Sequence, residues 1–261
     1  MDTEAGGASR AGGAGLHNED AFLVEQGLGL YVVCDGAGGA PAGEVAARIA
    51  AEALEDFVDW TIAELEREDE EAARRLVERA MVHALDEIAH AERDDPKLDG
   101  LTTTITMLLA HGDLGVIGQR GDSCAYRIRR RRVEPLTAEH EGAEAAPHAV
   151  THGSDFRVFA FSLEPRDTIV LCTDGAEAAV RDESIATSAA SLSPQLLASR
   201  IVSEAHRRNS SHDATAVVIR VRGEGEAGWL ALSSEPRGTA FGHTLEPVST
   251  KTPERRGRTR S

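Results

Sequence analysis

The chain has 261 residues, of which 41% are hydrophobic, and its formal net charge is -16. This length suits one large domain, and the negative charge argues against binding nucleic acid or an anionic membrane as the main role. No apolar run approaches the roughly 20 residues that cross a bilayer, and the N-terminal residues lack the features of a signal peptide. We therefore expect a cytoplasmic protein.

The three cysteines, Cys34, Cys124 and Cys172, are widely spaced and form no CxxC pair. This pattern argues against a disulfide framework and against a thiolate zinc site. We expect the cysteines to be small buried hydrophobic residues in a reducing compartment.

In chain order, a Gly- and Ala-rich segment over residues 1–15 is expected to be a flexible N-terminus. Apolar and β-branched runs then predict strands, over 21–26, 29–34, 102–110, 114–119, 124–128, 132–136, 156–162, 167–172 and 214–221. Apolar residues at three-to-four spacing predict helices, over 43–65, 70–92 and 193–208. Residues 223–261 are rich in Gly, Ser, Thr and Pro and are interpreted as a low-complexity tail.

The strands outnumber the helices, and the long helices fall between groups of strands. This order favours an α+β fold, with a central antiparallel β-sandwich flanked by helices on both sides, over an alternating doubly wound sheet. We expect one such domain over residues 16–222.

Four aspartates lie where predicted apolar strands begin or end: Asp35, Asp122, Asp174 and Asp213. Aspartate disfavours strands, and gathered carboxylates raise one another's pKa, unless cations lie between them. Clusters that offer only oxygen select hard metals such as Mg²⁺ or Mn²⁺. The pattern therefore predicts a metal-dependent hydrolase.

Several short motifs accompany these aspartates in a fixed order: NEDA at 18–21, DGAGG at 35–39, TTT at 102–104, GDSC at 121–124, LTAEH at 136–140, TDG at 173–175 and DATAVVI at 213–219. In this order the chain resembles the type 2C (PPM) metal-dependent protein serine/threonine phosphatases, of a bacterial type with a shortened flap region. The resemblance implies a helix-flanked β-sandwich with two, or with a weaker third site three, Mn²⁺ or Mg²⁺ ions at one edge.

The resemblance also implies roles for individual residues. Asp35 would bridge two metals, and the Gly36 carbonyl would bind the first. Asp174 and Asp213 would hold the second metal, and Asp122 would join Asp174 at a third. The remaining predicted catalytic residues, Glu19 and Asp20, would act through metal-bound waters and hydrogen bonds.

Some positions depart from the family pattern. Gly15 stands where many members have an arginine that clamps the substrate phosphate, and Cys124 replaces the arginine of GDSR. His212 is interpreted as an exposed loop histidine, with protonation of the leaving alcohol as the alternative. The basic run Arg129–Arg132 is interpreted as a solvated hairpin turn, or as a docking site for acidic or phosphorylated partners.

The function predicted first is hydrolysis of phosphoserine and phosphothreonine in proteins by a metal-bound hydroxide at a dinuclear site. Its partners would be a phosphorylated protein substrate and a Ser/Thr kinase that it opposes, and the chain would act as a monomer. One alternative is a weak or inactive phosphatase fold that serves as a regulatory binding module. Another is a hydrolase of small phosphoesters, which a shortened flap would permit.

Overall fold

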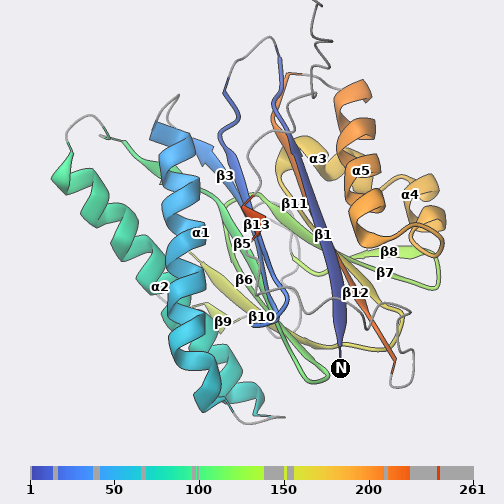
Figure 1. The fold of residues 1–261 in the computed structure, drawn as a ribbon, viewed down its shortest axis with the longest axis horizontal. Coiled ribbons are helices and arrows are strands. Elements are labelled where there is room, and N and C mark those ends of the chain that lie inside the picture. The colour runs from blue at the N-terminus through green and yellow to red at the C-terminus, as the bar shows by residue number, and fades with distance from the viewer. Residues whose placement is uncertain are drawn as a thin grey trace, which may run out of the picture.

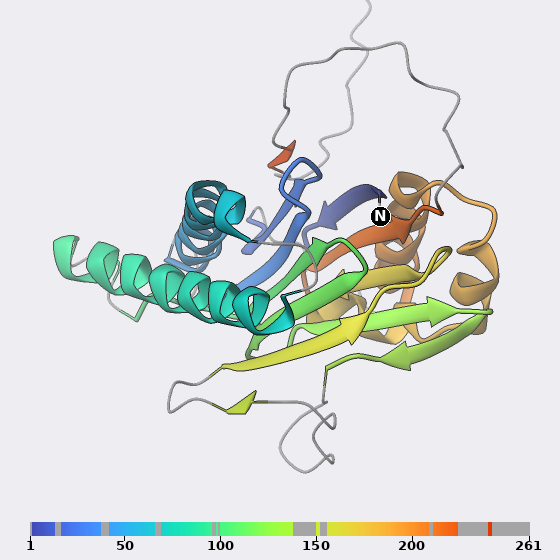
Figure 2. The same cartoon turned by 90° about the horizontal axis from the view of Figure 1, so that it is seen from below.

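The structure is a computed structural model, and it describes residues 2–13, 17–37, 42–65, 69–95, 98, 100–137, 150–151, 156–208, 211–223 and 240–241. Two antiparallel sheets pack face to face with helices on both outer sides, as Figures 1 and 2 show. The predicted α+β sandwich is confirmed.

Sheet A has five strands, in the spatial order β1 (Thr3–Arg10), β12 (Ala214–Val221), β11 (Thr168–Cys172), β7 (Cys124–Arg129) and β8 (Arg132–Pro135). Sheet B runs in the order β13 (Ala240–Phe241), β2 (Asp20–Glu25), β3 (Leu30–Ala37), β5 (Ile105–His111), β6 (Leu114–Arg120), β10 (Arg157–Ser162) and β9 (Val150–Thr151). The short strand β4 (Thr102–Thr103) also pairs with β3. Each predicted strand therefore has a counterpart in one of the sheets.

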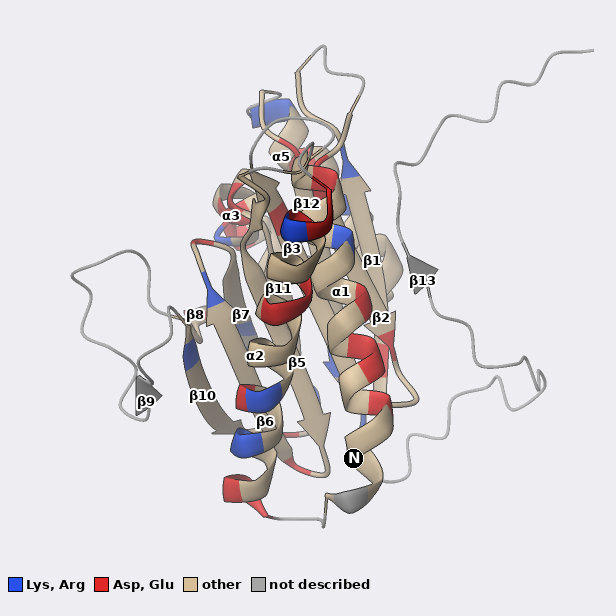
Figure 3. Cartoon of the chain, turned by 90° about the vertical axis from the view of Figure 1, so that its left-hand side faces the viewer, with Lys and Arg blue, Asp and Glu red and all other residues tan. Residues whose placement is uncertain are grey.

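Long helices cover sheet B on its outer side: α1 (Ala42–Thr61), which continues into a 3-10 turn over Ile62–Glu64, and α2 (Glu70–Asp94). Helices α3 (Asp174–Val180), α4 (Glu183–Ser188) and α5 (Pro194–Arg208) cover sheet A. Figure 3 shows charged residues on the outward faces of α1 and α2, whereas Arg74 of α2 is buried. Their alanine-rich inner faces are buried, so the helices approach sheet B closely.

The apolar core has three parts, one between the sheets and one beneath each helical layer. Along β3, Tyr31 and Val33 pack between the sheets, while Val32 and Cys34 pack beneath the helices. A strand that is buried on both faces must be apolar at every position, which explains the unbroken run before Asp35. Among the described residues, no helix is both long and apolar enough to cross a membrane.

The prediction of a flexible segment over residues 1–15 is wrong for Thr3–Arg10, which forms strand β1. All eight residues of β1 pair with β12, from Thr3 opposite Val221 to Arg10 opposite Ala214. The sequence did not predict this strand, because its glycines and small residues lack the apolar alternation of a typical strand. The predicted tail contributes β13 to sheet B, and its other residues from 224 onward lie outside the described residues.

Candidate metal centre

Acidic residues from distant parts of the chain line one cavity of about 450 Å³. It lies where β3 and β11 end and β12 begins, and its acids are Glu19, Asp35, Asp122, Asp174 and Asp213. Of the residues predicted from sequence, Gly36 also lines this cavity. Asp20 lies next to it on β2, directly opposite Asp35, with a side chain that is buried. All seven predicted site residues therefore meet in one region.

The backbone around Asp35 is held by its neighbours on both sides. Its amide donates to the hydroxyl of Thr104 at 3.0 Å, and its carbonyl accepts from the Thr104 amide at 2.8 Å. The next amide, that of Gly36, donates to the Glu19 carbonyl at 3.1 Å. These bonds fix where the Asp35 side chain leaves the strand.

Gly36 is required at its position by the packing of the backbone. A Cβ atom there would overlap the Gly43 carbonyl at the start of α1 and lie 2.8 Å from the Glu19 carbonyl. Gly175 has the same role one residue after Asp174, because a Cβ atom there would overlap the carbonyl of Asp213. Both glycines let the carboxylate-bearing segments approach each other.

Asp213 joins two segments from the N-terminal part of the chain. One of its carboxylate oxygens accepts from the Gly12 amide and the other from the Glu19 amide, both at 2.7 Å. Each carboxylate oxygen has two acceptor directions, so both still have a lone pair for a cation or water. Asp213 thus positions the end of β1 and the start of β2 beside the cavity.

Asp174 begins helix α3, and that helix is anchored to sheet A by Glu177. The Glu177 carboxylate accepts from the Tyr126 hydroxyl at 2.6 Å and from the Arg181 guanidinium at 2.9 Å. Cys124, at the position where the family has an arginine, is buried nearby with its thiol 3.9 Å from Glu177. This network fixes the helix that presents Asp174 to the cavity.

Asp20 is a buried acid with one satisfied and one unsatisfied oxygen. Its Oδ2 accepts from the hydroxyls of Thr173 at 2.9 Å and Thr215 at 2.6 Å. Its Oδ1 is buried without a hydrogen-bond partner among the described residues. A buried oxygen of this kind costs free energy unless a ligand or water completes it. This oxygen therefore suits a hydrogen bond from the water of a hydrated cation.

The electrostatics of the cavity favour the same conclusion. Burial, together with the charges of the neighbouring Asp174, Asp122 and Asp213, raises the pKa of Asp35 to about 7. Burial, followed by the charge of Asp35, also raises the pKa of Asp20 well above its usual range. Carboxyl groups that are forced to hold protons at neutral pH would release them to divalent cations.

The acids line a cavity rather than a closed cage. Within the described ranges, no three side chains of the metal-binding types already meet as a ready-made ligand cluster. Mg²⁺ and Mn²⁺ suit such an arrangement, because these hard cations take oxygen ligands and Mg²⁺ keeps several of its waters when it binds.

Sequence reasoning missed several residues of the site. Thr173 and Thr215, the hydroxyl partners of Asp20, lie one residue before Asp174 and two after Asp213, and this proximity to motif aspartates was the available signal. His17, directly before the NEDA motif, and Ser211, two residues before Asp213, also line the cavity and carried the same signal. Gly15 and residues 38–41 lie outside the described residues, so the predictions made there stay predictions.

His212 lines the cavity with a side chain that is 56% exposed. Its Nδ1 lies 3.7 Å from an oxygen of Asp174. From the sequence, an exposed loop histidine and a histidine at the site were alternative interpretations. In the structure His212 is exposed and also lines the cavity.

Comparison with known proteins decides the family. The family model for protein phosphatase 2C matches residues 7–212, which include all the acids described above except Asp213, the next residue after the match. The chain belongs to the protein phosphatase 2C family. The family and the enzyme class predicted from sequence, a serine/threonine protein phosphatase, are thereby confirmed.

Individual relatives agree with this assignment. The chain is 28% identical over 184 residues to serine/threonine phosphatase stp of Listeria welshimeri, covering 61% of this chain and 72% of that one. The crystal structure of the Mycobacterium tuberculosis serine/threonine phosphatase PstP/Ppp superposes with a TM-score of 0.71 at 22% identity, over 85% of this chain and 100% of that one. The PstP catalytic domain in complex with two manganese ions superposes equally well, at 24% identity over 85% of this chain and 99% of that one.

Proposed function

We propose that this protein removes phosphate from phosphoserine and phosphothreonine of proteins, with two divalent cations, Mn²⁺ or Mg²⁺, held in the acidic cavity. The observation that carries the proposal is the convergence of five acids from distant segments on one cavity in a protein phosphatase 2C fold. In a binding module without cations, the buried Asp20 oxygen that has no hydrogen-bond partner among the described residues would be a cost without a benefit.

The ligand roles follow from where each group lies. Asp35 stands among Asp174, Asp122 and Asp213, which all act on its pKa, and we assign it the position between two cations. The Gly36 carbonyl would bind one of these cations, Asp174 and Asp213 the other. Asp122, which is exposed on the rim between β6 and β7, would join Asp174 at a weaker third position.

The cations would neutralise the phosphate charge and lower the pKa of a water between them to near neutrality. The protein itself supplies positioning. Glu19, which lines the cavity, and Asp20, which lies next to it, would accept hydrogen bonds from metal-bound waters, and the hydroxyls of Thr173 and Thr215 hold Asp20 in place. In-line attack on a phosphomonoester needs mainly such positioning and charge neutralisation.

A direct test compares hydrolysis of a phosphothreonine peptide and of p-nitrophenyl phosphate with Mn²⁺ and with EDTA. We expect activity only with the cation, and a loss of at least about 100-fold for Asp35→Asn and for Asp174→Asn. Asp59→Asn, which changes an exposed acid on α1, is the matched control and should retain full activity.

The alternatives give different results in the same assay. Activity that is unaffected by EDTA, or by both substitutions at the cavity, would contradict the proposed mechanism. A folded wild-type chain without activity on either substrate would instead favour the binding module. A strong preference for p-nitrophenyl phosphate over several phosphopeptides would favour a small-phosphoester hydrolase.

We further propose a phosphorylated protein as substrate, an opposing Ser/Thr kinase as functional partner, and a monomer as the active form. The three buried cysteines are free thiols, which supports the reducing cytoplasm as the place of action.

A further inference from the structure

A second cavity, of about 700 Å³, lies on sheet A away from the acidic one. We call it the arginine groove because its lining includes Arg129, Arg130, Arg131, Arg166 and Arg220. The rest of its lining contains one acid, Glu164, against the five arginines, and is otherwise small or apolar, with residues of α4 and of the turn before β11. A positively charged cavity is unexpected in a chain whose net charge is -16.

The arginine groove is separate from the candidate metal centre. Thr168 lines the groove and begins β11, whereas Asp174 follows the other end of that strand. At about 3.3 Å per residue, the six intervening steps place the two cavities roughly 20 Å apart. A ligand in the groove therefore does not occupy the space of a substrate phosphate at Asp35.

Three of these arginines occupy backbone conformations that normally belong to glycine or asparagine. Arg130 and Arg131 have φ of 52° and 64° in the two-residue turn between β7 and β8, where Asn-Gly is the favoured pair. Arg166 has φ of 74° after Pro165, at the position of a tight turn that usually requires glycine. The turns themselves do not favour arginine, yet all three arginines line one groove. Binding of a ligand would explain why arginine stands at these strained positions.

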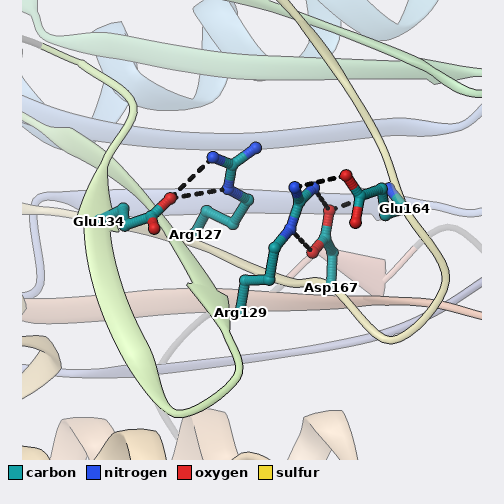
Figure 4. A network of polar contacts seen from close by, with 5 residues as sticks. All are labelled: Arg127, Arg129, Glu134, Glu164 and Asp167. Carbon is teal, nitrogen blue, oxygen red and sulfur yellow. Dashed lines mark hydrogen bonds and ion pairs between the residues drawn. The ribbon is translucent and has the colours of Figure 1, made fainter.

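Some arginines of the groove already bind protein groups, whereas others are exposed and could bind a ligand. The Arg129 guanidinium donates to Asp167 at 2.6 Å and to Glu164 at 2.7 Å, and Figure 4 shows both contacts. Arg220 donates to two backbone carbonyls, both at 2.6 Å. Arg130 and Arg131 are exposed, and the described part of the chain offers their side chains no hydrogen bond or ion pair.

We propose that the arginine groove docks an acidic segment of a partner protein. Two exposed guanidinium groups at the tip of a short hairpin can each bind a carboxylate through two parallel hydrogen bonds. The apolar lining beside them, including Ile128 and Pro165, suits aliphatic side chains between the acidic ones. A nucleic acid fits poorly, because the rest of the acidic protein would repel its phosphates.

The binding test uses a fluorescein-labelled peptide of alternating glutamate and valine, followed by fluorescence anisotropy without added metal. We expect binding that weakens as salt increases, and at least about 10-fold weaker binding by the double variant Arg130→Asn with Arg131→Gly. The same variant should unfold roughly 2–6 °C higher than wild type, because it restores the favoured turn sequence. If this variant is more stable than wild type and still binds the peptide less well, misfolding cannot be the cause of the weaker binding.

The matched control removes two exposed arginines elsewhere, with Arg93→Gln on α2 and Arg200→Gln on α5. It changes net charge equally and should keep peptide binding within about 2-fold. Equal weakening by the control, or no weakening by the hairpin variant, would overturn the inference. So would displacement of the peptide by inorganic pyrophosphate at lower concentration than by unlabelled peptide, since the groove would then select small anions.

The result does not depend on the proposed phosphatase activity, because binding is measured without metal. Hydrolysis of p-nitrophenyl phosphate by the hairpin variant should equal that of wild type. If the chain hydrolysed no phosphoester at all, the anisotropy experiment would still decide whether the groove docks an acidic segment.

Discussion

Two arginines on the same strand are expected to contribute very differently to stability. Arg129 pairs with Asp167, whose side chain is 1% exposed, whereas Arg127 pairs with Glu134, which is 44% exposed (Figure 4). Arg129→Met would leave a buried carboxylate without its partner and should lower the free energy of unfolding by about 3–5 kcal/mol. Arg127→Met should cost less than about 1 kcal/mol. Urea denaturation of both variants checks the difference, and equal effects would contradict it.

Thr215 is a second residue whose effect can be predicted from its contacts. Its hydroxyl bonds to Asp20 at 2.6 Å and to Ser9 at 2.7 Å, in a fully buried setting. Thr215→Val should cost about 1–3 kcal/mol of unfolding free energy, because it leaves these polar groups short of a partner. It should also reduce phosphatase activity roughly 10-fold by loosening Asp20.

Thr187→Val is the control for that change, since Thr187 is exposed on α4 and, within the described ranges, its hydroxyl bonds only to a backbone carbonyl of its own helix. Full activity of Thr215→Val with an unchanged urea midpoint would show that Asp20 does not need this hydroxyl.

At the scale of elements, the sequence predicted the apolar strands and long helices well and the short or glycine-rich elements poorly. Helices α3 and α4 have seven and six residues, which is too short for a helical repeat to show. Strand β1 was missed because Gly6 and Gly7 lie where a typical strand has side chains. Because glycine has no Cβ atom, α5 can pack closely against Gly6 and the Phe22 ring can pack closely against Gly7.

Gly7→Val tests that explanation. A side chain at this position would overlap the ring of Phe22, which is buried between the sheets, so we expect a loss of about 2–3 kcal/mol in unfolding free energy. Arg10→Val places the same side chain at the exposed end of β1 and should change stability by less than about 0.5 kcal/mol. A tolerated Gly7→Val would mean that β1 is not packed tightly against β2.

For the whole molecule, the clustered acids make stability depend on both pH and cations. The pKa of Asp35 in the folded protein, about 7, is higher than its usual value of 3.8, so the folded state binds more protons between these values. The metal-free protein should therefore lose stability as the pH rises from about 4 to about 7. Below about 4 the stabilising contribution of this group is fully present.

Thermal unfolding in EDTA across this pH range checks the prediction, with Asp35→Asn as the variant whose curve should be flatter. Addition of Mn²⁺ at pH 7 should raise the melting temperature of wild type, because cations bind the folded state and replace the protons. A melting temperature that is independent of both pH and Mn²⁺ would contradict the assignment of this cavity as a metal centre.

The pairing of β1 with β12 has a consequence for how the protein is made. Thr3 lies opposite Val221, so sheet A joins almost the first residue of the domain to almost the last. At about 5–20 residues per second, a ribosome needs roughly 10–45 s to synthesise the chain from the first of these strands to the second. Until then Asp213 has not been brought to Gly12 and Glu19, and a nascent chain lacks part of the proposed ligand set. Truncated translation products of this protein would accordingly be inert toward phosphoproteins.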